Sequence, residues 1–326
     1  MVLFLGSIPA VAKSWPAVTV EKTSYHGWPN VYRMSNGTIQ LLITADVGPR
    51  IIWYGFAGGQ NEFHEFSDQA GKTGGTEYRS YGGHRLWVSP EVERTYFPDN
   101  APVRVIQKEG AVIFTAPVEA ASPGTHLQKE IEVHLSPNGT HVNVIHRITN
   151  LSAQPTLMSP WGLSSMEQGG VGILPLPPKV RWNKAQLLPE SLIALWSYTD
   201  LSDPRWSIGS KYLFLKADAA PVGNLKEQMT GIFNAAGWIA YYRNHHVFVE
   251  RVQVEKAAKY PDFGCNFEMY TEPGFLELET LGPLIDLQPG ATVLHSEDWW
   301  LVQNVPEGSG DTWVDTEVLP RIEQAR

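Results

Sequence analysis

The sequence predicts an all-β fold, a large antiparallel β-sandwich, and two observations support this prediction. Strand-like runs of alternating apolar and polar residues are separated by turn signals about every ten residues, in a chain with 24 Pro and 29 Gly. The 3.6-residue periodicity of amphipathic helices is almost missing. No internal repeat and no low-complexity linker divides the chain, so we expect a single domain over residues 18–302 and a C-terminal extension over 303–326.

Composition limits the classes of partner. Charged residues make up 18% of the 326 residues, the formal net charge is −9, and there are 12 Trp. Because binding to phosphate groups requires a basic surface, nucleic acid and anionic membranes are not expected partners. No internal stretch approaches the roughly 20 apolar residues of a membrane helix, so no membrane insertion is expected.

The first residues resemble an export signal. Val2–Val11 is apolar, and Ala10-Val11-Ala12 has the small-x-small form of a signal-peptidase site. We therefore interpret residues 1–12 as the remnant of an export signal, which predicts a periplasmic or secreted protein. The alternative is a buried first strand in a cytoplasmic protein.

Several local elements are expected from turn residues. Asn36-Gly37 predicts a tight hairpin, and Ser136-Pro137-Asn138-Gly139 predicts a second one between Leu127 and Asn150. Residues 188–198 have the pattern of a short helix. The single cysteine, Cys265, excludes an internal disulfide and is expected to be a small core residue.

The two predicted strands at 266–271 and 275–281 carry carboxylates on one face. Side chains alternate across a strand, so Glu277 and Glu279 share a face, and Glu268 lies on the corresponding face of its neighbour. Either this face is solvated or it is the floor of a binding site. Acids beside aromatic residues, in a chain poor in charge, favour the binding site.

The segment YGGHRLWVSPE, residues 81–91, is the other candidate for a binding element. Two glycines allow a sharp turn or a close approach of the backbone, and His84, Arg85 and Trp87 follow at once, with Glu91 at the end. We interpret it as a ligand-binding loop. The alternative for His84 is a hydrogen-bonded structural histidine.

No metal-ligand motif and no cofactor motif is present in the sequence. There is no HExxH, no EF-hand and no Cys/His ligand spacing, so no metal and no cofactor is expected. His146 lies on an apolar stripe of a strand and is expected to be a satisfied core residue. His245 and His246 are adjacent, point to opposite faces of a strand, and are expected at a solvated turn.

Several of these segments together carry a family resemblance. DVGPRIIWYGFAGGQNEF at 46–63, RITNLSAQP at 147–155, SPWGLSSMEQGGVGILPLP at 159–177 and LELETLGP at 276–283 resemble the galactose mutarotase (aldose 1-epimerase) superfamily. Within it the chain looks closest to an uncharacterised bacterial family, a domain of unknown function. The resemblance implies a mutarotase-like β-supersandwich with a concave, sugar-binding sheet.

The resemblance also implies roles for individual residues. Glu279, in its LET context, resembles the catalytic glutamate of the epimerases and would be the base, with His84 as acid or substrate orienter. Arg85, Trp87, Glu91, Trp161, Glu268 and Glu277 would bind the sugar. The epimerases have a second catalytic histidine, but no histidine lies between His146 and His245 in this chain.

Three functions stay open at this stage. The first is a carbohydrate-active enzyme, an epimerase-like isomerase with acid/base chemistry at or near the anomeric carbon of a mono- or oligosaccharide. The second is a glycosidase or polysaccharide lyase on the same fold. The third is a non-catalytic sugar-binding protein, which the missing histidine favours. The sequence leaves the oligomeric state unknown.

Overall fold

The computed structural model describes residues 18–108, 110–122, 125–182, 184–185, 187–218 and 227–325. The expected export signal at 1–12 lies outside these residues and stays a prediction. Among the described residues, no helix is both long and apolar enough to span a bilayer.

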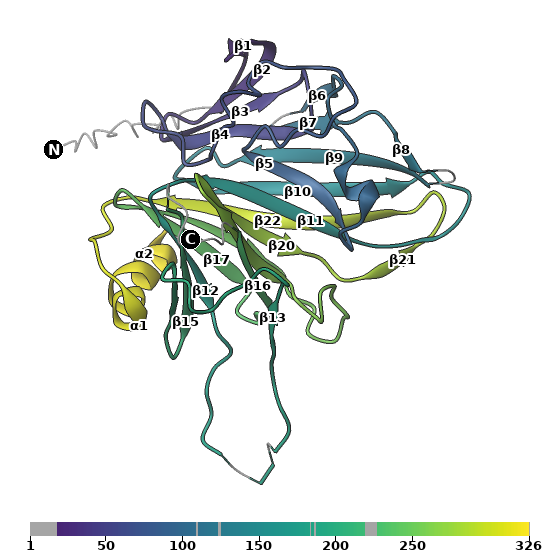
Figure 1. The fold of residues 1–326 in the computed structure, drawn as a ribbon. Coiled ribbons are helices and arrows are strands. Elements are labelled where there is room, and N and C mark those ends of the chain that lie inside the picture. The colour runs from purple at the N-terminus through teal and green to yellow at the C-terminus, as the bar shows by residue number, and fades with distance from the viewer. Residues whose placement is uncertain are drawn as a thin grey trace, which may run out of the picture.

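The described chain forms two antiparallel sheets, each of eleven strands, and so confirms the predicted β-sandwich (Figure 1). The first sheet contains, in spatial order, β1 (Thr19–Tyr25), β2 (Trp28–Ser35), β3 (Ile39–Thr44), β4 (Arg50–Phe56), β5 (His84–Ser89), β11 (Thr156–Glu167), β20 (Phe275–Leu281), β19 (Phe267–Glu272), β16 (Gln228–Ile232) and β13 (Ile193–Leu195), with β21 (Ile285–Leu287) paired to β11.

The second sheet packs against the first. It contains, in spatial order, β14 (Trp206–Ile208), β15 (Tyr212–Lys216), β12 (Val171–Pro175), β17 (Trp238–Arg243), β18 (His246–Val252), β22 (Thr292–Val302), β10 (Val142–Asn150), β9 (Thr125–Leu135), β7 (Ala111–Thr115) and β6 (Arg104–Lys108), with β8 (Glu119–Ser122) paired to β9. The main hydrophobic core lies between the sheets and includes Leu86, Val144, Phe267 and Leu278.

Both predicted hairpins are present. Gly37, at φ +84°, turns β2 into β3. Gly139, at φ +69°, lies in the turn between β9 and β10, where Leu135 pairs with Val142. Asn–Gly and Asn-containing turns fit these positions because glycine adopts positive φ without steric cost.

The described part of the C-terminal extension, residues 303–325, packs on the second sheet rather than standing apart. It contains α1 (Gly310–Trp313), a π-helical turn η2 (Val314–Val318) and α2 (Leu319–Gln324). Trp313, Val318 and Ile322 are buried in a hydrophobic cluster with residues of β12, β15, β17 and β18, on the side of the sheet facing away from the core. Figure 1 shows α1 and α2 beside β15 and β12.

The prediction of a short helix at 188–198 is wrong. Within this segment the structure has strand β13, which pairs with β16, and a turn from Trp196 to Thr199. Strand pairing supplies the backbone hydrogen bonds of Ile193–Leu195, and tertiary context overrides local helix propensity.

The segment at 81–91 is also different from the expectation of a loop. Residues 84–89 form the central strand β5, between β4 and β11. The two glycines before it lie where a side chain would collide with backbone oxygens: a Cβ would be 2.1 Å from the oxygen of His64 at Gly82, and 2.2 Å from that of Ile51 at Gly83. Both have positive φ, so the Gly-Gly pair lets the chain enter the sheet.

Candidate functional site

A cavity lies on the face of the first sheet that is turned away from the core. Its floor is formed by β5, β11, β20 and β19, which are neighbours in that order. Leu163 pairs with Arg85 on one side and with Glu279 on the other, and Glu279 pairs with Glu268. The side chains of directly paired residues lie on the same face of a sheet, so Arg85, Leu163, Glu279 and Glu268 all point to one side.

The cavity has a volume of about 340 Å³ and is rich in aromatic and acidic side chains. This volume lies at the lower end of the range of small-molecule sites. The described lining residues are Tyr78, Ser80, Arg85, Trp87, Glu91, Tyr96, Trp161, Leu163, Trp196, Tyr198, Glu227, Met229, Tyr270, Glu272, Phe275, Glu277 and Glu279. The structure therefore brings six of the eight predicted site residues to one cavity.

A larger hollow, of about 610 Å³, lies between residues 189–192 and 256–264. It is more open, and its lining combines apolar side chains with Lys256 and Lys259 and with Glu190, which is exposed. The smaller cavity is the better candidate, because buried groups with perturbed ionisation mark functional sites.

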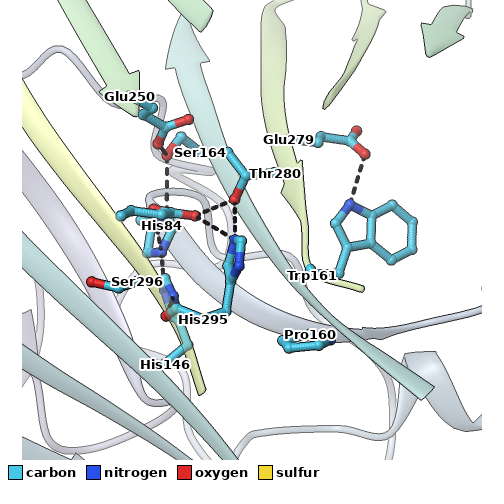
Figure 2. A network of polar contacts seen from close by, with 12 residues as sticks. His84, His146, Pro160, Trp161, Ser164, Glu250, Glu279, Thr280, His295 and Ser296 are labelled. Atoms are coloured by element: carbon cyan, nitrogen blue, oxygen red, sulfur yellow. Dashed lines mark hydrogen bonds and ion pairs between the residues drawn. The ribbon is translucent and has the colours of Figure 1, made fainter. Parts of the chain in front are cut away.

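Glu279 is the buried carboxyl at the floor of this cavity. It is 1% exposed, and its Oε2 accepts a hydrogen bond of 2.9 Å from the indole N–H of Trp161 (Figure 2). Burial, followed by the charge of Glu277, raises the pKa of Glu279 well above its ordinary value. A carboxyl in this state keeps its proton at pH values at which an exposed one has lost it.

Glu268 lies beside Glu279 on β19, fully buried, and is not among the residues that line the cavity. Burial and then the neighbouring Glu279 raise the pKa of Glu268 well above its ordinary value. Neither of its oxygens has a partner in strict hydrogen-bond geometry among the described residues. Two adjacent carboxylates in a low-dielectric site resist full ionisation, so the pair retains protons.

The pKa of Glu277 is shifted in the opposite direction. Its two oxygens accept bonds of 2.6 and 3.1 Å from the guanidinium of Arg85, and the hydroxyl of Ser165 donates a further bond of 2.6 Å. Burial disfavours the carboxylate, but Arg85 and Ser165 outweigh burial and lower the pKa of Glu277. Glu277 is therefore an ionised, bidentate partner of Arg85.

Trp87 lies at the edge of the cavity and is partly exposed. The guanidinium carbon of Arg85 lies 4.4 Å from the centre of its ring, and the ring of Trp161 meets it edge-on at 5.4 Å. Tyr96 also contacts Trp87, and its hydroxyl donates to the carboxylate of Glu91. The indole is thus fixed in place by its neighbours, as a stacking platform for a ligand has to be.

Besides Tyr270 and Phe275 of the floor strands, four aromatic residues from elsewhere in the chain line the cavity and were not predicted as site residues: Tyr78, Tyr96, Trp196 and Tyr198. They come from segments that the sequence does not connect to the floor strands, and only the fold brings them to the cavity. No local pattern identifies them, although the density of Trp and Tyr in the chain was a general signal.

His84 does not line the cavity, and the predicted pair with Glu279 is not formed. It is the neighbour of Arg85 on β5 and points to the opposite face, into the space between the sheets, where it is fully buried. Burial, with the charges of His146 and Arg85, lowers the pKa of His84 well below its ordinary value. Figure 2 shows His84 with His146 and His295, apart from Glu279 and Trp161.

The raised pKa values of Glu268 and Glu279 predict a pH-dependent stability. A carboxyl whose pKa is higher in the folded than in the unfolded state binds more protons when folded, so the free energy of unfolding falls as pH rises from the unfolded value toward the folded one. Each such group contributes up to about 1.4 kcal/mol per pH unit in this window. The other charges that act on this pair come from Glu277, Glu91, Asp262 and Arg85.

We expect Glu268→Gln to make the free energy of unfolding fall less steeply above pH 4.5, because one proton-binding group is removed. Urea unfolding at a series of pH values measures this slope. Glu323→Gln, a change at an exposed residue of α2, should reproduce the wild-type slope. Equal slopes for the Glu268 variant and the wild type would contradict the assignment.

Comparisons with known proteins agree with this fold. No protein-family model matches the chain, and no curated protein matches it. Among solved structures, a presumed aldose 1-epimerase from Klebsiella pneumoniae superposes with a TM-score of 0.57 at 11% identity, over 87% of this chain and 83% of that one. A galactose mutarotase related enzyme from Lactobacillus acidophilus gives 0.51 at 11% identity, over 86% and 99%.

A third structure, a galactose mutarotase-like protein from Lactobacillus casei, has a TM-score of 0.50 at 12% identity and covers 83% of this chain and 100% of its own. At such identities the similarity concerns the fold, and it extends over nearly the whole length of these proteins. The chain therefore has the fold of the galactose mutarotase-like proteins.

Proposed function

We propose that the chain binds the ring of a neutral sugar in the 340 Å³ cavity and interconverts its anomers by acid/base chemistry. The observation that carries the proposal is Glu279: a carboxyl with a raised pKa, oriented by an indole N–H, at the floor of an aromatic cavity. Such a group is suited to proton transfer with a bound hydroxyl or ring oxygen.

The charge of the cavity favours a neutral sugar over an acidic one. The described lining contains five carboxyl groups, from Glu91, Glu227, Glu272, Glu277 and Glu279, and one guanidinium, which Glu277 already engages. A carboxylate on the ligand would meet net negative charge in a low-dielectric site, whereas sugar hydroxyls donate hydrogen bonds to these acids.

The reaction needs an acid and a base at the same time. Glu279 in its protonated form gives its proton to the ring oxygen, and a carboxylate takes the proton of the anomeric hydroxyl. The bond between the anomeric carbon and the ring oxygen breaks, and a carbonyl forms. Rotation about the adjacent bond and the reverse transfer close the ring on the other face.

Glu91 is the best candidate for the second group. It lines the same cavity as Glu279, and its charge contributes to the raised pKa of Glu279. The hydroxyl of Tyr96 donates a hydrogen bond to it and orients it. In this proposal Glu268 touches no substrate and acts on Glu279 as a positioning residue.

The glycosidase or lyase reading has less support. Glu277, the nearest carboxyl along the strand, is held in a bidentate ion pair with a lowered pKa, and the remaining pair, Glu279 and Glu91, is the one that the anomer interconversion already uses. The non-catalytic sugar-binding protein remains the second candidate. In its favour, no histidine occurs among the described residues that line the cavity.

We expect Glu279→Gln to lower the rate of anomer interconversion by about 10²–10⁴-fold while leaving sugar affinity nearly unchanged, because the amide keeps the shape and loses the transferable proton. Polarimetry and NMR exchange on a panel of neutral aldoses and uronic acids measure the rate, and calorimetry measures the affinity.

Glu323→Gln is the matched control and should retain the wild-type rate. Full activity in the Glu279 variant would remove Glu279 from the mechanism. A wild-type protein that binds sugars and converts none of the panel would establish the non-catalytic candidate instead.

We expect Trp87→Ala to weaken sugar binding by about tenfold or less, the loss of a stacking contact of roughly 1 kcal/mol. Trp182→Ala is the control, because Trp182 is 77% exposed and lies outside the cavity. Calorimetric titration of both variants distinguishes the platform from general loss of aromatic surface. Unchanged affinity in Trp87→Ala would show that another ring carries the stacking.

A further inference from the structure

A second polar cluster is enclosed between the two sheets, behind the floor of the cavity. His84 of β5, His146 of β10 and Glu297 of β22 are each 0% exposed. One ligand atom from each of them lies within 4.8 Å of the others. The cluster therefore joins one strand of the first sheet to two strands of the second.

The donor atoms converge on one point. Nε2 of His84 lies 2.7 Å from Nε2 of His146 and 3.7 Å from Oε2 of Glu297. Around a tetrahedral zinc ion, with bonds of about 2.0–2.2 Å, neighbouring ligand atoms are roughly 3.3 Å apart. The two observed distances, 2.7 and 3.7 Å, bracket this separation. A modest opening of the two imidazoles therefore makes room for an ion.

The second ring nitrogen of each histidine, Nδ1, has a polar partner, as it does in most metal-bound histidines. Nδ1 of His146 contacts the carbonyl oxygen of His295 at 3.1 Å. A carbonyl only accepts, so Nδ1 carries the proton and Nε2 of the neutral ring presents its lone pair to the centre. Nδ1 of His84 contacts Oγ of Ser164 at 2.9 Å, and Ser164 in turn contacts the carboxyl of Glu250.

The carboxylate of Glu297 is oriented as firmly. Its Oε2 accepts a hydrogen bond of 2.9 Å from the indole N–H of Trp299, and its Oε1 accepts one from the hydroxyl of Thr280. Backbone carbonyls, carboxylates and indole groups that fix the ligands in this way raise metal affinity and select the tautomer.

We propose that His84, His146 and Glu297 form a buried site for a divalent transition-metal ion of the zinc class. Two imidazoles and one carboxylate are a ligand set that suits zinc. The carboxylate of Glu297 offsets part of the charge of the ion, and an enclosed site requires such an opposite charge. The ion links the two sheets, so its role is structural.

This site is independent of the sugar cavity. Ser164 and Thr280 lie on the floor strands β11 and β20, but alternation turns them to the interior, while Leu163 and Glu279 face the cavity. The proposal therefore stands or falls separately from the proposed function.

The test uses the untagged full-length protein, expressed with added zinc and desalted. We expect about one equivalent of zinc per chain by plasma mass spectrometry, and visible absorption bands from bound cobalt when the chelator-stripped protein is titrated with Co²⁺. His146→Gln and Glu297→Gln should lose the stoichiometric metal. His126→Gln, a change at an exposed histidine of β9, should keep it.

A chelator should lower the melting temperature of the wild type and of His126→Gln, and should leave that of His146→Gln unchanged. The competing structure is an ion-free hydrogen-bond chain, in which Nε2–H of His84 donates to His146. A folded wild type that holds no zinc and gives no cobalt spectrum would establish that chain and overturn the metal site. Both measurements, the zinc content and the cobalt spectrum, use the wild-type protein alone.

Discussion

The register of β5, β11, β20 and β19 is the constraint on which the site depends. Leu163 of β11 lies opposite Arg85 on one neighbour and Glu279 on the other, and this pairing fixes which side chains face the cavity. A shift by one residue would exchange the two faces: Thr280 would enter the cavity and Glu279 the core. Burial of Leu86 and Leu278 between the sheets prevents such a shift.

Strands β5 and β20 carry polar side chains on both faces of the sheet. Arg85 and Glu279 face the cavity, whereas their chain neighbours His84 and Thr280 face the space between the sheets. On the outer face, Glu277 is stabilised as an anion by Arg85, whereas Glu279 accepts a hydrogen bond from the uncharged indole of Trp161 and faces a second acid, Glu268. Environment therefore divides the work between identical residue types: Glu277 holds Arg85 in place, and Glu279 retains a labile proton. Keeping such acids buried costs stability, as is usual at functional sites.

The sequence predicted the fold and part of the site, and the misses have a physical reason. Alternation placed Glu268, Glu277 and Glu279 on one face, as observed, because strand periodicity is local. His84 was misplaced because the Gly-Gly pair suggested a loop, although Leu86 and Val88 already marked a strand with His84 on its apolar side. The aromatic walls and the cluster between the sheets depend on long-range pairing, which one sequence does not encode in any local pattern.

The central claim is that the aromatic cavity over Glu279 holds the ring of a sugar. A crystal structure of the protein soaked with the neutral monosaccharide that binds best tests it most directly. The account predicts one sugar in the cavity, stacked on Trp87, with its anomeric hydroxyl or ring oxygen within hydrogen-bond distance of Glu279. A sugar bound only elsewhere on the molecule, with the cavity over Glu279 holding none, would contradict it.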